Sequence, residues 1–363
     1  VEPYAFPREL GFVINAALGR GAEVNWHARG LWQMAGALLR YFHHSRPATH
    51  ALATQAYSQL IAHALDEHAP LIVASGAEDL VSREGFRFVF RTESAMNKAL
   101  RHAQQLEERF GVRHHAEDRQ TLAHSEPALK SGLVGALHWL DPWAVRNPGD
   151  LVHRYARYFE SRGGRVVLGD AKTLSQSGAG WAVQTKLGRL EAEHAVLALG
   201  PWADAATQSL GYRFPLFIKR GYHQHYTTTS TVRQPFLDAE RGYVLAPMQK
   251  GLRLTTGAEF ATIDARPSPV QLAKAEALAR ELVDLGQALP EPAWMGARPC
   301  TADMLPIMGA APRHKGLWFN FGHSHQGFTL GPVAGRLLAE LIDGGRSWID
   351  ATPYSPKRFT STA

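Results

Sequence analysis

Residues 296–342 hold the densest group of side chains that could take part in chemistry. Arg298 is followed by a polar loop that contains His323, His325 and Gln326 and has glycines on both sides. A guanidinium group pairs with a carboxylate through two parallel hydrogen bonds, and imidazole or amide groups can bind a polar ligand or move a proton. These residue types predict a site for an anionic ligand.

A strand, a glycine-bounded loop and a helix must position these groups. Pro332 suits the first turn of a helix over residues 332–342, and Gly344 suits its carboxyl end. The free N–H groups at such a helix start favour an anion, either a phosphate or a heterocycle that gains charge on reduction. The structural alternative is that Gly322 and Gly327 only permit a tight turn between strand and helix.

Two long motifs in this segment resemble FAD-dependent D-amino-acid dehydrogenases and the related glycine and sarcosine oxidases. They are Gly-x-Arg-Pro-x-Thr-x-Asp-x-x-Pro-x-x-Gly at residues 296–309 and Gly-His-x-x-x-Gly-x-Thr-Leu-Gly-Pro at residues 322–332. Residues 195–203 look like that family's second dinucleotide-contacting strand and turn. Residues 1–7 are similar to the family segment that follows the flavin-binding amino-terminal unit.

The resemblance implies an α/β fold, a mixture of α and β elements in two domains. We expect a Rossmann-like FAD-binding domain from residues 145–210 and 297–350, and a substrate-binding domain with a mainly antiparallel sheet and helices from residues 5–144 and 211–296. The family opens with a strand, a Gly-x-Gly-x-x-Gly turn and a helix, and this sequence contains no such fingerprint. We therefore expect that about 40 to 50 residues of the FAD-binding unit precede Val1, and that this chain alone binds FAD poorly.

The resemblance also implies roles for individual residues. Arg298 matches the arginine that binds the substrate carboxylate, Tyr243 matches a tyrosine that touches the same carboxylate, and Tyr4 matches a tyrosine near the substrate. His325 and Gln326 would lie close to the substrate. The residues expected to contact FAD are Ala171, Ala198, Gly200, Trp202, Gly322, His323, Ser324, Gly327, Phe328 and Thr329.

Several of these residues also have a structural interpretation. Arg298 could form a structural ion pair, Tyr243 could be a core aromatic residue, and residues 323–326 could form a solvated loop. Cys300 is the sole cysteine, and the family's flavin-linked cysteine aligns with Gly296, so we predict that FAD is bound without a covalent link.

Residues 220–225 alternate as a strand, and one face of this strand could line the pocket. His223 and His225 lie two apart on that strand and could ligate zinc, but no third ligand is suggested nearby. We therefore predict no metal site.

The composition indicates a globular protein and argues against nucleic-acid-binding and membrane-spanning classes. With 363 residues, 45% of them hydrophobic, the chain can bury a large core. A net charge of +6 without a basic run argues against nucleic acid, and one cysteine without an apolar span or secretion signal predicts a cytoplasmic protein. The amphipathic residues 31–42 either pack on the core or dock on the inner face of a bacterial membrane.

Hydrophobic periodicity predicts the remaining elements. Residues 1–7 form a loop, and Ser94 caps a helix that ends at Gly111. Helices are expected at residues 28–42, 51–69, 94–110, 150–161 and 269–285, and strands at residues 86–91, 165–168, 181–186, 195–199, 222–228, 243–247 and 252–256.

The resulting expectation is a flavoenzyme that removes a hydride from the Cα of a D-amino acid. The imino acid product would hydrolyse to a 2-oxo acid and ammonia, and oxygen or a quinone would accept the electrons. Two alternatives are kept: oxidation of a secondary amine such as N-methylglycine or a D-proline relative, and a non-catalytic binding protein.

Overall fold

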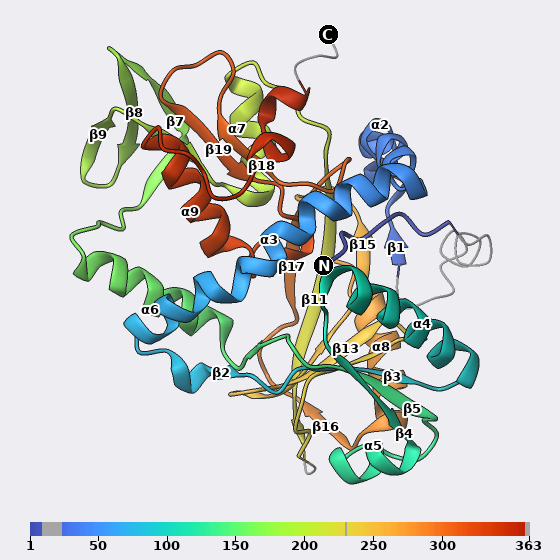
Figure 1. The fold of residues 1–363 in the computed structure, drawn as a ribbon. Helices are drawn as coiled ribbons and strands as arrows, with labels where there is room; N and C mark the ends of the chain where they lie inside the picture. The colour runs from blue at the N-terminus through green and yellow to red at the C-terminus, as the bar shows by residue number, and fades with distance from the viewer. Residues whose placement is uncertain (9–23, 229–230, 360–363) are drawn as a thin grey trace.

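A computed structural model describes residues 1–8, 24–228 and 231–359 of the chain. The long strand β11 (Leu216–Thr228) pairs with four neighbours and forms the centre of an eleven-stranded sheet (Figure 1). The other strands of this sheet are β1 (Val24–Trp26), β3 (Phe86–Phe90), β4 (His114–Asp118), β5 (Gly135–Trp139), β12 (Phe236–Asp238), β13 (Tyr243–Met248), β14 (Gly251–Thr255), β15 (Ala258–Phe260), β16 (Leu285–Ala288) and β17 (Trp294–Thr301).

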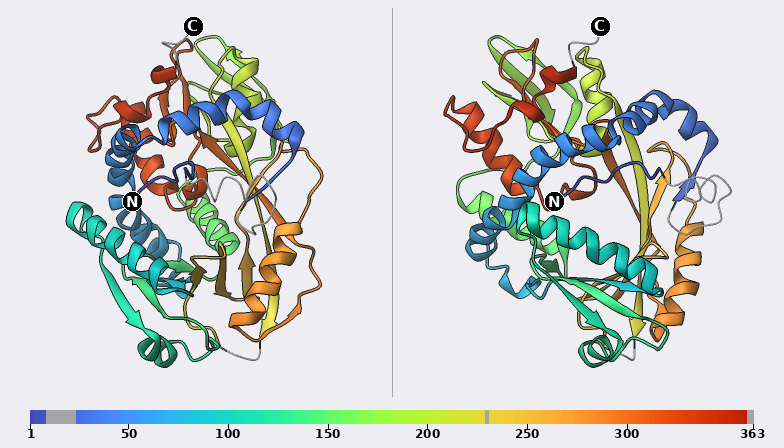
Figure 2. Two further views of the ribbon diagram at one scale, coloured as in Figure 1. Left: turned by 90° about the vertical axis from the view of Figure 1, so that its right-hand side faces the viewer. Right: turned by 45° about the vertical axis from the view of Figure 1, so that its right-hand side comes forward.

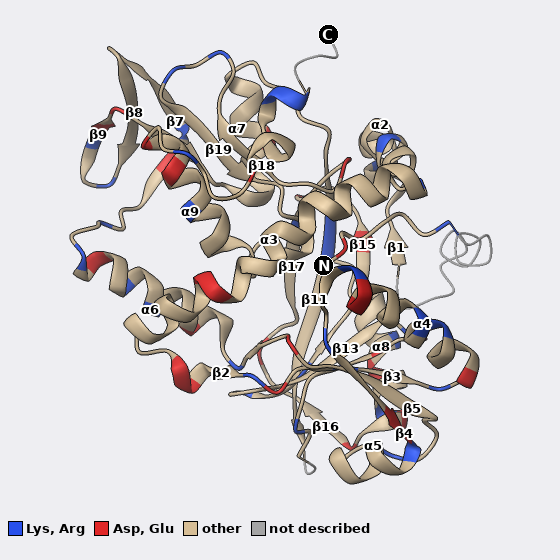
Figure 3. Cartoon of the chain, in the orientation of Figure 1, with Lys and Arg blue, Asp and Glu red and all other residues tan. Residues whose placement is uncertain are grey.

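The alternation of side chains along β11 gives this sheet two different faces. Tyr222 and Tyr226 point to the face that α8 (Val270–Leu282) covers, and there they join a core with Leu272 and Ala275. Strand β11 contains basic residues (Figure 3). Lys219 and Arg220 are adjacent in this strand, so their side chains point to opposite faces of the sheet. Arg220 is fully buried on the α8 side, where Nη2 lies 2.6 Å from the Glu259 carboxylate.

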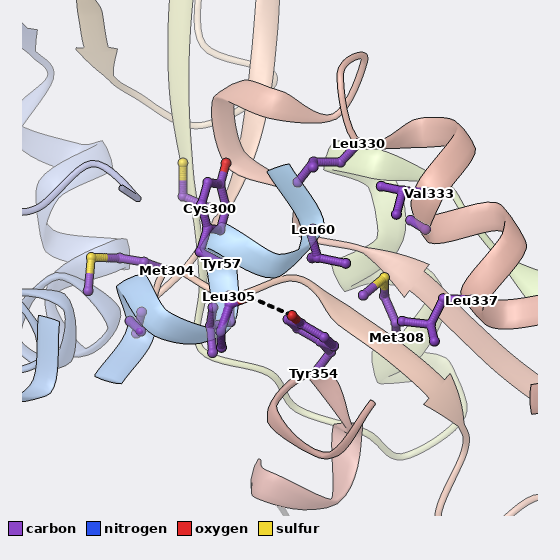
Figure 4. Packing of buried hydrophobic residues seen from close by; sticks show 14 of the residues in the cluster. Tyr57, Leu60, Cys300, Met304, Leu305, Met308, Leu330, Val333, Leu337 and Tyr354 are labelled. Carbon is purple, nitrogen blue, oxygen red and sulfur yellow. Dashed lines mark hydrogen bonds between the residues drawn. The ribbon is translucent and has the colours of Figure 1, made fainter. Parts of the chain in front are cut away.

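The opposite face of β11 and β17 packs against three helices. These are α2 (Ala28–His44), α3 (Pro47–Ala74) and α9 (Gly331–Ile342), which share one core with Phe217 and Cys300 (Figure 4). The Tyr354 hydroxyl donates to the Ala56 carbonyl oxygen at 2.6 Å and fixes the carboxyl-terminal segment to α3. Met34 and Tyr41 are the buried apolar side chains of α2, and the partly buried Leu38 packs against the same core.

Two of the smaller sheets lie at the other end of the molecule from β3, β4 and β5 (Figure 2). Strand β19 (Leu317–Phe321) pairs parallel with β10 (Ala195–Leu197) and antiparallel with β18 (Ile307–Ala310). Beside them β7 (Gly169–Ser177), β8 (Gly180–Thr185) and β9 (Gly188–Ala192) form an antiparallel meander, and β2 (Val81–Ser82) pairs with β6 (Ala144–Val145). These strands include the segments expected in the FAD-binding domain, whose boundaries stay a prediction.

The strand expected at residues 165–168 does not form. Val166 and Leu168 are exposed, and the strand of this region begins only at Gly169. The short apolar run after Gly163 and Gly164 is therefore not a buried strand, and it lies on the surface between α6 (Pro148–Ser161) and β7.

The remaining helices follow the predicted pattern with small shifts. The helix expected at residues 94–110 is α4 (Glu93–Phe110), and Thr92 caps it in place of Ser94, because the Thr92 hydroxyl accepts from the Ala95 N–H at 3.4 Å. Gly111 ends this helix with φ of 68°, as expected. The other short elements are α5 (Arg119–Ser125), α7 (Ala203–Ser209), η1 (Glu78–Leu80), η2 (Gly200–Trp202), η3 (Ser324–Gln326), η4 (Thr352–Tyr354) and η5 (Pro356–Phe359). Among the described helices none is both long and apolar enough to cross a membrane.

The buried Glu259 carboxylate makes the stability of the sheet dependent on pH. Burial by itself raises the pKa of this carboxyl, but hydrogen bonds from Ser268, Tyr222 and Arg220 outweigh burial and hold the pKa below its usual value. A folded-state pKa below the unfolded value adds stability above the unfolded pKa, and this stability is lost as the pH falls through the folded pKa.

We therefore expect Glu259→Gln to lower the free energy of unfolding by about 3 to 5 kcal/mol at pH 7. Below pH 4.5, the ordinary pKa of a glutamate, the difference between variant and wild type should shrink. Urea unfolding followed by circular dichroism at pH 7 and pH 4 measures both values. A difference that does not change with pH would contradict this account.

Candidate functional site

The pairing of β11 with β17 places two basic residues side by side. Lys219 lies opposite Arg298 in the antiparallel register, and Gly221 lies opposite Gly296. Because paired residues point to the same face, Lys219 and Arg298 both project toward α2 and the loop after β19. A glycine pair without side chains lies beside them.

The glycine at position 221 gives the Arg298 guanidinium its place. A Cβ atom at Gly221 would lie 2.6 Å from Nη2 of Arg298, so any larger residue would displace the guanidinium. Nη1 of Arg298 lies 3.4 Å from the Gly257 carbonyl oxygen, and no carboxylate of the described residues pairs with this arginine. The structural ion pair is therefore not formed among the described residues, and the guanidinium can receive an anionic ligand.

The first residues of the chain lie against the loop that follows β19. The Tyr4 ring is 4.6 Å from the His325 ring, and the Tyr4 carbonyl oxygen accepts from the Tyr41 hydroxyl at 2.6 Å. Both Tyr4 and His325 interact electrostatically with Arg298. The structure thus brings together three of the residues that the motif analysis assigned to the substrate.

Two histidines of the loop have buried nitrogen atoms without a partner. Nε2 of His323 and Nδ1 of His325 are buried, and neither has a hydrogen bond to the described part of the chain. Burial lowers the pKa of His323 to about 4, and burial with the nearby charges of Arg298 and Lys219 lowers that of His325 to about 2. Both imidazoles are therefore neutral at pH 7 and can hydrogen-bond to a ligand.

A small cavity with room for about one water molecule is lined by Tyr4, Lys219 and His325. Its walls come from the amino-terminal segment, from α2 and α3, and from the two paired strands. The lining residues are Pro3, Tyr4, Tyr41, Tyr57, Phe217, Lys219, Cys300, Thr301, Met304, Ser324 and His325.

The motif residues Thr301 and Asp303 shape the turn beside this cavity. The Thr301 hydroxyl donates to the Leu305 carbonyl oxygen at 2.7 Å, and Asp303 pairs with Arg358 at 2.7 Å. Met304, which follows Asp303, has a φ of 68°, a conformation that residues other than glycine seldom adopt. These contacts indicate a structural role, and they identify Arg358 as a supporting residue that the sequence did not reveal.

A hydrogen bond from α3 holds the other end of the loop. The His68 ring connects the Phe328 carbonyl oxygen, at 3.2 Å from Nε2, with the Tyr155 hydroxyl, at 2.9 Å from Nδ1. The rings of His68 and Phe328 also stack, with centroids 5.9 Å apart. His68 therefore links the loop to α3 and α6, and nothing in the sequence marked it for this role.

The residues expected to contact FAD gather where the parallel strands β10 and β19 end. Parallel strands place their carboxyl ends at one edge, where ligands of α/β sheets bind. The residues at this edge are Ala198, Gly200, Trp202, Gly322, His323, Ser324, Gln326, Gly327, Phe328 and Thr329. Ala171 lines a separate open groove of about 430 Å³ beside β10, together with Val196 and Leu199.

The buried Nε2 of His323, which has no partner among the described residues, fits the flavin ring of FAD at this edge. A planar heterocycle with hydrogen-bonding edges would supply the partner that this atom lacks. The individual FAD contacts remain predictions.

Tyr243 lies away from this group. It is fully buried on the α8 face of the sheet, and its hydroxyl donates to the Leu278 carbonyl oxygen at 3.4 Å. Because β13 directs alternate residues to opposite faces, Tyr243 points away from Arg298, and the core interpretation replaces the expected substrate contact. His223 points to the side of Arg298 and stacks on Trp294 at 4.8 Å.

Comparison with known proteins places this geometry among flavoproteins. Residues 18–341 match the family described as DAO: FAD dependent oxidoreductase. The D-amino-acid oxidase of Bradyrhizobium diazoefficiens is 29% identical over 301 residues, which cover 80% of this chain and 70% of the oxidase. The D-amino acid dehydrogenase of Cereibacter sphaeroides is 31% identical over 212 residues, which cover 54% of this chain and 46% of that enzyme. The chain thus spans about half the length of some of its curated relatives.

Solved structures agree in fold. The crystal structure of glycine oxidase from Geobacillus kaustophilus superposes with a TM-score of 0.69 at 25% identity, covering 82% of this chain and 80% of that one. The L-proline dehydrogenase of P. horikoshii gives the same TM-score at 18% identity, over 84% of both chains.

The contact between Gly221 and Arg298 can be tested directly. We expect Gly221→Ala to weaken the binding of a small carboxylate such as propionate roughly tenfold, because the new methyl group displaces the guanidinium. The free energy of unfolding should change by less than about 1 kcal/mol, since a flexible side chain makes the clash. Calorimetric titration and urea unfolding measure the two quantities.

Gly36→Ala is the matched control, because a Cβ at Gly36 in α2 meets no atom within 4 Å. Its carboxylate affinity should equal that of the wild type. Equal affinities in all three proteins would show that Gly221 does not set the position of Arg298.

Proposed function

Because the chain belongs to the family of FAD dependent oxidoreductases, we propose that it oxidises the Cα–N bond of an amino acid. The product is an imino acid, which water hydrolyses to a 2-oxo acid and ammonia. FAD, when bound, supplies the acceptor for the hydride that leaves Cα. Relatives named D-amino-acid oxidase and D-amino acid dehydrogenase support a D-amino acid as the substrate.

The half-buried Arg298 guanidinium is the observation that carries this proposal. It has no carboxylate partner among the described residues, and burial lowers its pKa because the charge is poorly solvated. A substrate carboxylate would restore the missing countercharge through two parallel hydrogen bonds. The pairing would fix the carboxylate and so restrict the orientation of the adjacent Cα.

His325 is placed to receive the amino group of the same substrate. Its imidazole is neutral, and in the tautomer protonated at Nε2 the unpartnered Nδ1 can accept a hydrogen bond from the substrate nitrogen. A histidine whose pKa is about 2 is a weak base, so this hydrogen bond orients the amine rather than removing its proton. The narrow cavity keeps bulk water away from these groups.

The exposed apolar side chains of α2 support a membrane quinone as the electron acceptor. Trp32 and Leu39 lie two turns apart on its outer face and are 84% and 71% exposed. Arg29 and Arg40 belong to the same helix and would favour an anionic surface. A membrane contact through this face supports a quinone as acceptor, with oxygen as the alternative.

Two substitutions test whether Arg298 binds the substrate carboxylate, and they separate the charge of the guanidinium from its two parallel hydrogen bonds. Arg298→Met removes both and should lower kcat/KM for the preferred amino acid by roughly 30- to 1,000-fold, equivalent to about 2 to 4 kcal/mol. Arg298→Lys keeps the charge but loses the two parallel hydrogen bonds, so its loss should be smaller. FAD content, read from flavin absorbance of the full-length protein, should stay unchanged in both variants.

A near-normal kcat/KM in Arg298→Met would show that Arg298 does not bind the substrate carboxylate. A variant that unfolds instead would indicate a structural role for the guanidinium.

The membrane contact has its own test. We expect the double variant Trp32→Ser, Leu39→Ser to bind vesicles of anionic lipids roughly tenfold more weakly, because two large apolar side chains leave the contact. Val152→Ser on α6 also removes an exposed apolar side chain and should leave vesicle binding unchanged. Co-sedimentation with vesicles measures binding, and equal binding of all three proteins would contradict the contact.

A further inference from the structure

Lys219 is a buried amine next to the proposed carboxylate anchor. Lys219 is 7% exposed, and its Nζ lies 3.0 Å from the Tyr41 hydroxyl oxygen. The same Nζ lies 4.4 Å from the centroid of the Tyr41 ring and 5.4 Å from that of Phe217. Lys219 also lines the cavity that Tyr4 and His325 enclose.

The neighbouring basic residue of the same strand shows how this fold satisfies a buried cation. Arg220 is fully buried, pairs with the Glu259 carboxylate at 2.6 Å and donates to the Arg266 carbonyl oxygen at 3.1 Å. Lys219 has no carboxylate partner among the described residues, and burial, together with the charge of Arg298, lowers the pKa of its amine. Arg220 on the α8 face of the strand is therefore paired with a carboxylate, whereas Lys219 on the cavity face has no countercharge among the described residues.

Hydrogen-bond directions leave the Lys219 amine free to bind a ligand. The Tyr41 hydroxyl donates its proton to the Tyr4 carbonyl oxygen at 2.6 Å, so its oxygen must accept from Nζ of Lys219. An ammonium group has three N–H donors, and this contact uses one. The aromatic rings add cation–π attraction, which is weaker than the cost of burying an ammonium group.

Burial lowers the pKa of both Lys219 and Arg298, so an anion beside each group would stabilise its charged form. The α-carboxylate of any amino acid supplies one negative charge, to Arg298 in the proposed function. The described residues around the cavity contribute no carboxylate, and another part of the same ligand can supply the second charge.

We propose that Lys219 binds a second carboxylate, and that the substrate is an amino acid whose side chain carries a carboxyl group. This inference rests on the proposed function and names its substrate class. Arg298 would bind the α-carboxylate, His325 the amino group and Lys219 the side-chain carboxylate. Three contacts at three different substituents would also select one configuration at Cα.

A binding experiment tests the inference without turnover. Glutarate carries two carboxylates, whereas its monoamide has the same shape and one charge. We expect glutarate to bind the full-length protein roughly 10- to 100-fold more tightly than the monoamide, as expected for a hydrogen bond between charged groups. Isothermal titration calorimetry measures both affinities, and equal affinities would overturn the second anchor.

Variants of Lys219 assign the preference to this residue. Lys219→Met keeps the length of the side chain without its charge and should reduce the glutarate preference to about threefold or less, while the affinity for the monoamide changes little. Lys219→Arg should retain a preference. Lys186→Met removes an exposed lysine near β9 and is the matched control. A preference that survives Lys219→Met would overturn the assignment, and the ligand comparison on the wild type stands even where a variant does not fold.

Kinetics on the FAD-loaded protein separate this inference from the proposed function. We expect kcat/KM for D-glutamate or D-aspartate to exceed that for D-glutamine or D-asparagine by roughly 10- to 100-fold, and Lys219→Met to abolish the difference. Oxidation without an acidic preference would overturn the inference and leave the proposed function intact. Tight glutarate binding without oxidation of any amine would overturn the proposed function alone.

Discussion

The register between β11 and β17 is the constraint on which the site depends. It sets Lys219 opposite Arg298 and Gly221 opposite Gly296. A slip of one residue would turn these side chains to the α8 face, where Glu259 and a hydrophobic core already fill the space. The apolar residues of β11 fix this register, since Tyr222 and Phe217 are buried on opposite faces. Core packing on both sides of the sheet thus determines which basic groups reach the cavity.

The motif residues nearest the site divide into those that bear chemistry and those that hold the backbone. His323 and His325 have buried nitrogen atoms without a partner among the described residues, and the proposed function adds Arg298 as a ligand anchor. Thr301 and Asp303 instead use their polar atoms within the protein. Strain at Met304 is tolerated because the Thr301 hydroxyl and Arg358 hold the turn on both sides. His68 does the same for the far end of the loop. The site is therefore formed by a loop with two fixed ends over a rigid sheet.

Sequence patterns predicted those parts of the site that are local in the chain. The strand, the loop and the helix of residues 317–342 lie in one continuous segment, so residue spacing was enough to place His323 and His325. The face to which a strand residue points depends instead on strands distant in sequence. For this reason Tyr243 seemed to be a substrate contact although it lies on the α8 face, and Lys219 was not recognised. The prediction of a strand at residues 165–168 was wrong for a related reason. An apolar run alone does not show that another element covers the segment, and Val166 and Leu168 are exposed.

The electrostatic balance of the two faces of β11 connects stability with function. On the α8 face, Arg220 and Glu259 neutralise each other, so this part of the sheet is complete without a ligand. On the cavity face, Lys219 and Arg298 remain without a countercharge, and the folded chain bears the cost of their burial. A ligand that supplies the missing charge binds the folded state alone and so stabilises it by mass action. The cavity face, where Lys219 and Arg298 have no countercharge among the described residues, is thus the face that we propose binds a ligand. An anion in the cavity would offset the free-energy cost of burying these two groups.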